Sequence, residues 1–174
     1  MWFYFIGFLP VFLDFYITLP HGGSLNALPD LLGYALLILA AFRSEYENGH
    51  LRRQRTVCFI ALPLSLAEFI LEVAAFRLPD AVTLSVSILM TALSLYIAYE
   101  FSEGAKKLER SRYQKLTAEK LASAWIILAM SSLLRILAFF FTPIALTCEF
   151  LHMFAVIWFS AATFGFVRRL QKKR

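Results

Sequence analysis

Several ionisable side chains lie within or beside apolar stretches of this sequence, where a lipid-facing helix should carry none. Such residues are costly in a membrane, normally face the interior of a helix bundle and often belong to a functional site. At a rise of ~1.5 Å per residue, most of them fall in one layer, roughly 8 to 13 Å below one membrane surface. We take them as one candidate ligand-binding cluster, made of Asp14, Asp30, Glu68, Glu72, Arg135, Glu149 and His152.

Two of these carboxylates, Glu68 and Glu72, are four residues apart and so share one helical face. Two ionised carboxylates at this spacing repel each other, and burial increases the cost. We expect compensation by protonation of one carboxyl, by pairing with Arg77 or Arg135, or by a bound cation.

The last two apolar stretches are joined by a tight turn at Thr142 and Pro143. Arg135 and Glu149 are almost equally distant from that turn, which predicts an ion pair between two antiparallel helices. One interpretation is that this pair is buried and only fixes the register of the two helices.

Glu149 and His152 have the Glu-x-x-His spacing that lets one helix present two ligands to a metal ion. The chain lacks a second such motif, so the two residues are weak metal candidates, and a histidine bonded to a neighbouring carboxylate is the alternative. We expect no cofactor.

Hydroxyl groups form a stripe along one helical face at Thr83, Ser87, Thr91 and Ser94. Small polar residues often allow close packing of membrane helices, and Ala161 with Gly165 form a similar pair of small residues. We expect both sets to serve helix packing, with a polar pathway as the alternative for the hydroxyl stripe.

The elements that must position these groups are membrane helices. The chain has 174 residues, is 60% hydrophobic and contains 18 Phe, and the alternation typical of a β-barrel is absent. A single all-α domain, residues 1–174, is predicted, with six apolar stretches near the ~20 residues that a bilayer requires. They form three hairpins and cover residues 2–19, 25–42, 56–76, 81–101, 121–141 and 144–167.

Fifteen of the 17 Lys and Arg residues fall in the loops 43–55 and 102–120 and in the tail 168–174. Basic loops are retained in the cytoplasm, so both termini are predicted to be cytoplasmic. The basic surplus then contacts anionic lipid headgroups, and no nucleic-acid partner is expected. The first stretch lacks a basic start and an A-x-A site and contains Asp14, which favours a retained helix over a cleaved signal peptide.

Proline marks the predicted outer turns. Pro29, Pro79 and Pro143 should each open a helix, where the missing amide proton is no loss. The cysteines, Cys58 and Cys148, fall near opposite ends of their predicted helices, so no disulfide is expected between them.

The segment Leu28-Pro29-Asp30-Leu31-Leu32-Gly33-Tyr34 carries a resemblance. It is similar to the L-P-D-x-x-G-Y segment that opens the second helix in a group of uncharacterised small multi-pass membrane proteins of Gram-positive bacteria. The similarity covers the first two helices and the six-span layout. It implies a helical bundle in the bacterial cytoplasmic membrane and transfers no catalytic residue.

Three functions fit these features. The first is a transport or solute-binding component, with an acidic pocket in the outer half of the bundle for a cation or cationic solute. Such a component can work with a membrane partner subunit. The second is a membrane-embedded metal-dependent enzyme, and the third is a structural or regulatory subunit of a membrane complex. The motifs weigh against an enzyme. The inner half is expected to be nearly free of buried charge, with no polar path continuing towards the cytoplasm.

Overall fold

A computed structural model shows a helical protein with one small β-hairpin. Four of its helices, α3 (Gly49–Val73), α4 (Asp80–Ser111), α5 (Ala118–Ala138) and α6 (Ala145–Lys172), are long and apolar enough to cross a membrane. Two shorter helices, α1 (Trp2–Phe12) and α2 (Asp30–Ser44), precede them. The structure describes residues 2–13, 16–18, 24–26, 29–44, 48–74, 76, 79–111, 118–138 and 141–172.

The first two predicted spans are shorter than expected. Helix α1 stops at Phe12 and α2 starts at Asp30, and between them β1 (Tyr16–Thr18) pairs antiparallel with β2 (Ser24–Asn26). Hydropathy reports apolar character but does not specify conformation, and β-branched Ile17 and Thr18 favour an extended strand. With 11 and 15 residues, α1 and α2 are about 17 and 23 Å long at ~1.5 Å per residue.

The longer helices also differ from their predicted bounds, chiefly at the basic end. Helix α3 begins at Gly49 and α4 continues to Ser111, whereas the apolar stretches start at residue 56 and end at 101. Asn48 caps α3, because its side chain accepts a hydrogen bond from the backbone N–H of His50. The predicted proline positions are confirmed for Pro29 and Pro79, which directly precede α2 and α4, while Pro143 lies in the short 3₁₀-helix η2 (Thr142–Ile144).

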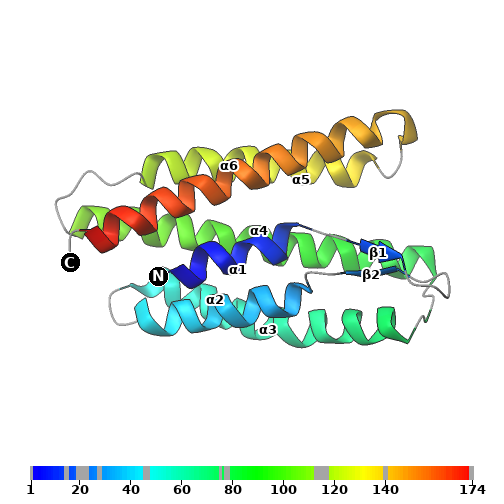
Figure 1. Ribbon diagram of the computed structural model, residues 1–174, viewed down its shortest axis with the longest axis horizontal. Coiled ribbons are helices and arrows are strands. Elements are labelled where there is room, and N and C mark those ends of the chain that lie inside the picture. Colours follow the sequence, from blue (N-terminus) through cyan, green and yellow to red (C-terminus); the bar gives the residue numbers. More distant parts are fainter. Residues whose placement is uncertain are drawn as a thin grey trace.

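The six helices form a closed ring in chain order. Each helix packs against the next one along the chain, and α6 returns to pack against α1. Figure 1 shows the helices lying along one common direction, with the start of α1 and the end of α6 at the same end of the molecule. The hairpin β1–β2 lies at the opposite end (Figure 1).

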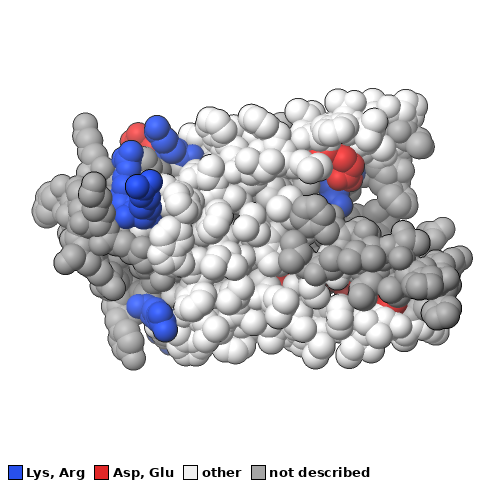
Figure 2. Space-filling view, viewed as in Figure 1, with Lys and Arg blue, Asp and Glu red and all other residues white. Residues whose placement is uncertain are grey.

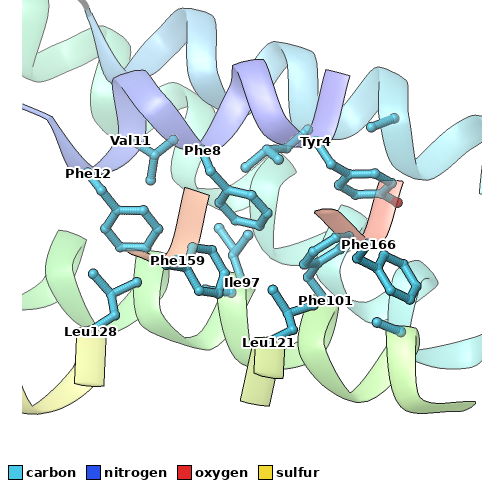
Figure 3. Close-up of a cluster of buried hydrophobic side chains, with 14 of the residues drawn as sticks. Tyr4, Phe8, Val11, Phe12, Ile97, Phe101, Leu121, Leu128, Phe159 and Phe166 are labelled. Carbon is cyan, nitrogen blue, oxygen red and sulfur yellow. The ribbon is translucent and has the colours of Figure 1, made fainter. Parts of the chain in front are cut away.

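Aromatic side chains fill the part of the ring that α1 covers (Figure 3). The Tyr4 ring lies 4.6 Å from that of Phe101, and the Phe8 ring lies 5.2 Å from those of both Phe101 and Phe159. The outer faces of the long helices instead expose large apolar residues, for example Phe150 and Trp158 on α6. An apolar exterior around a packed interior suits a lipid environment.

Close helix packing occurs between α1 and α2, not at the predicted pair on α6. A Cβ atom added at Gly33 would lie 2.7 Å from the backbone oxygen of Gly7, whereas one added at Gly165 would meet nothing within 4 Å. Ala161 is exposed. The packing prediction for Ala161 and Gly165 is therefore wrong.

Most of the visible Lys and Arg gather at the end where α6 finishes, where an acidic side chain also shows (Figure 2). Acidic side chains near the other end, which carries the hairpin, lie beside a basic one (Figure 2). Cys58 and Cys148 are both buried and free, as expected.

Candidate functional site

A cavity of about 540 Å³ lies in the half of the ring beyond the end of α1. Its wall includes Phe12 at the end of α1, Asn26 of β2 and the first residue of α2, together with residues from all four long helices. The cavity exists because α1 and α2 stop short of the length of the other helices. Six of the seven candidate residues line it: Asp30, Glu68, Glu72, Arg135, Glu149 and His152. The seventh, Asp14, lies outside the described residues, as does Arg77.

The α3 wall presents Glu68 and Glu72 to the cavity, both half-buried and one turn apart. The backbone N–H of Asn26 donates a hydrogen bond to Oε2 of Glu72 over 3.3 Å. A backbone amide thus stabilises one of the two carboxylates and ties the hairpin to α3.

The predicted ion pair between α5 and α6 is present. Nε of Arg135 donates to Oε1 of Glu149 over 2.9 Å. The two side chains are 36% and 49% exposed, so the expectation that the pair is buried is wrong. The pair lies at the edge of the cavity. Because the Arg135–Glu149 bond is partly hydrated, Glu149 can leave Arg135 and bind a ligand at a lower energetic cost than from a fully buried pair.

His152 lies deeper, with 5% of its surface exposed. Its Nδ1 is 3.3 Å from Oγ of Ser131, whereas Glu149 bonds to Arg135. Within the described part of the chain, no three His, Cys, Asp or Glu side chains are grouped so that they could hold a metal ion. The Glu-x-x-His spacing therefore does not assemble a metal site from the residues that the structure describes.

The hydroxyl stripe of α4 lines the cavity. Thr83, Ser87, Thr91 and Ser94 all border it, and Thr83 and Ser87 are exposed. Ser94 is buried; it donates to the Met90 carbonyl over 2.7 Å, which leaves its oxygen to accept from the Tyr34 hydroxyl of α2 at 2.8 Å. The packing expectation therefore fits Ser94, whereas Thr83 and Ser87 face open space.

The chemistry of the lining favours a positively charged ligand. Four carboxylates, those of Asp30, Glu68, Glu72 and Glu149, face the cavity against the single guanidinium of Arg135. Carboxylates gathered between low-dielectric walls concentrate cations. Phe12 and Phe69 add aromatic surface to the same walls, and aromatic faces attract cations.

The half of the bundle at its basic end, predicted as the inner half, contains a buried carboxyl group that the sequence prediction did not include. Glu100 of α4 is 1% exposed, and its Oε2 lies 2.8 Å from Nδ1 of His50. Its Oε1 accepts a hydrogen bond from the Tyr96 hydroxyl at 2.8 Å and lies 3.6 Å from the Arg53 guanidinium. The expectation of an inner half nearly free of buried charge is therefore wrong. The sequence does contain a sign of this group, because Glu100 is a glutamate inside an apolar stretch. It was overlooked because it lies next to residue 101, the predicted end of that stretch.

Comparison with known proteins found no matching family model, no matching curated protein and no matching solved structure.

Proposed function

We propose that this chain is a multi-pass membrane protein that binds a cationic solute in the acidic cavity, as a transport or solute-binding component. The observation that carries the proposal is the convergence of carboxylates from α2, α3 and α6 on one cavity. Groups far apart in the sequence, at positions 30, 68, 72 and 149, meet only because the helix ring closes. A purely structural role would not require several like charges around one space.

The solute is an organic cation of the amine class. A volume of about 540 Å³ falls within the ~300 to 1,000 Å³ of small-molecule sites. A bare metal ion needs several ligands within bonding distance, and the described residues offer no such group. An ammonium group held by Glu68 and Glu72, with its alkyl part on Phe12 and Phe69, uses both the charge and the apolar surface of the cavity.

Six membrane helices arranged as three hairpins, with both termini in the cytoplasm, complete the proposal. The basic end of the bundle contacts anionic headgroups of the bacterial cytoplasmic membrane, and the cavity opens to the outside. The gathering of Lys and Arg at one end of the bundle in Figure 2 supports this orientation. A membrane partner subunit would supply any energy coupling that the chain itself lacks.

Binding can be tested with detergent-purified protein by calorimetry and melting temperature, using tetramethylammonium, butylamine and putrescine, with butanol as the neutral analogue. We expect at least one amine to bind, and Glu68→Gln to weaken that binding by about tenfold, since one ion pair in a partly hydrated site contributes roughly 1 to 2 kcal/mol.

Glu119→Gln is the matched control, because Glu119 is an exposed carboxylate in the first turn of α5, at the basic end. It should bind the amine as the wild type does. The proposal is wrong if no amine changes the melting temperature, or if both variants lose affinity equally.

A further inference from the structure

The buried face of α3 is partly polar. The buried residues of this face are Leu51, Gln54, Cys58, Ala61 and Ser65, of which Leu51 and Ala61 are apolar, and the face is extended by the partly buried His50, Glu68 and Glu72. The opposite face exposes large apolar residues such as Phe59, Ile70 and Val73. A membrane helix with this pattern turns its polar groups inward, as a helix beside an aqueous path does.

The outer end of this face opens on the cavity, and its inner end meets Glu100. Ser65, Glu68 and Glu72 line the cavity. At the other end, His50 is 25% exposed on its side chain and bonds to the buried carboxylate of Glu100. An imidazole ring carries two nitrogen atoms that can accept or donate a proton, so it can relay a proton between two neighbours. This pair can therefore pass a proton between the protein interior and the water at the basic end.

Gln54 lies between these two ends. Its side chain is 0% exposed, and neither its Nε2 nor its Oε1 has a hydrogen-bond partner among the described residues. Gln54 follows His50 by one turn, about 6 Å towards the cavity along α3. A buried amide is normally bonded to protein or to ordered water, so this position requires water.

Between Gln54 and the cavity, α3 places Cys58 and Ala61 in the apolar core, and the Tyr34 and Ser94 hydroxyls bond to each other at about the same level. Helices α3 and α4 are antiparallel, and since His50 faces Glu100, Cys58 lies within about one turn of the level of Ser94. The Tyr34–Ser94 hydrogen bond is at the cavity floor. Hydroxyl groups both accept and donate protons, so they can join the cavity to the water at Gln54.

We propose that the buried face of α3, with Tyr34, Ser94 and Glu100, forms a proton pathway from the outer cavity to the cytoplasmic end of the bundle, with Glu100 and His50 as its inner exchange site. A proton taken up by the Glu68 carboxylate passes to a hydroxyl or water oxygen, which releases its own proton to the next group. His50 finally releases one proton to water, so one proton enters for each one that leaves and no redox partner is required.

The titratable and charged groups that face Glu100 in the described structure are His50 and Arg53 of α3 and Tyr96 of α4. The pathway rests on the proposed function only for the cavity at its outer end.

The test measures proton flux into liposomes that contain the purified protein and a trapped pH-sensitive dye, with a potassium diffusion potential as the driving force. We expect the wild type to exceed protein-free liposomes. Glu100→Gln and Gln54→Leu should each lower this flux at least tenfold. If Glu100→Gln does not fold, His50→Asn, at the start of α3, provides a second test. We expect it to lower the proton flux in the same way.

Glu103→Gln is the matched control, since Glu103 pairs with Lys106 at the surface and lies outside the pathway. Its flux should equal that of the wild type. Amine binding, measured in detergent, should be unchanged in the Glu100, Gln54 and Glu103 variants. The inference is overturned if the wild type conducts no better than protein-free liposomes, or if Glu100→Gln conducts normally; unchanged amine binding would then leave the proposed function standing.

Discussion

The Arg135–Glu149 ion pair connects α5 and α6 close to their tight turn, at the edge of the acidic cavity. A charged group that is about half exposed cannot face hydrocarbon at this depth without a large cost. We infer that water reaching the cavity covers the exposed part of both side chains. The pair can therefore hold the helices in register and still take part in ligand binding.

Removing one partner should cost more than removing both. Arg135→Leu leaves Glu149 without its guanidinium and adds to the negative charge of the cavity, whereas Arg135→Leu with Glu149→Leu restores neutrality. We expect a coupling energy of about 1 kcal/mol, at the upper end of exposed pairs, because lipid lies nearby.

Melting temperatures of the wild type, both single variants and the double variant in one detergent measure this coupling. Strictly additive effects would show that the pair contributes no stability. Loss of amine binding in a stable double variant would assign Glu149 to the ligand.

At this scale the sequence located the ionisable residues that line the cavity but misjudged several environments. Ionisable residues in apolar stretches identify themselves, as Glu68 and Arg135 do, because lipid cannot hold them. How exposed each of these side chains is cannot be inferred from the sequence in this way, because it depends on the cavity, and the cavity depends on where other helices end. Glu100 was missed because the apolar stretch was taken to end one residue beyond it, while α4 continues for three more turns.

Among the elements, α1 and α2 make the tightest contact. Gly7 and Gly33 face each other across it, and a Cβ atom at Gly33 would lie 2.5 Å from Cγ2 of Val11. This crossing sets where α2 begins relative to α1. It therefore positions Asp30, three residues before Gly33, at the cavity wall.

Gly33→Ala should destabilise the protein by about 1 to 3 kcal/mol, the usual cost of overpacking a tight contact. The clash includes backbone, so a rotamer change cannot relieve it. Gly165→Ala is the control, because it adds a methyl group in open space within α6 and should leave stability equal or slightly raised. Melting temperature in detergent distinguishes the two, and equal effects would contradict the assigned packing.

The positions of α3 to α6 follow from hydropathy, and those of α1 and α2 do not. A continuous run of apolar residues that lacks long charged interruptions has few alternatives to a helix in lipid. The predicted spans 2–19 and 25–42 include β1 and most of β2, but these strands bond to each other and to Glu72. Which apolar segment becomes a hairpin depends on those contacts, and a local pattern does not contain them.

For the whole molecule, the ring and the basic residues at one end predict a defined orientation. Phe76 lies just after α3 at the acidic end and is 64% exposed, while Arg52 lies near the start of α3 at the basic end. In intact bacterial cells, a membrane-impermeant maleimide should label Phe76→Cys within minutes. It should label Arg52→Cys only after the membrane is permeabilised.

The wild type is the blank for this experiment, because its two thiols are buried. Labelling of Arg52→Cys in intact cells would reverse the orientation. Labelling of both positions would contradict a single topology.

The short α1 and α2 also determine how strongly the cavity can hold a ligand. The cavity lies where these two helices have ended, and water that enters it would raise the dielectric constant around the carboxylates. At 4 Å, two opposite charges attract by roughly 4 kcal/mol at an effective dielectric constant of about 20, but only about 1 kcal/mol in bulk water. If the proposed cation binds there, a hydrated site of this kind would capture and release it rapidly and so favour turnover of solute over long residence.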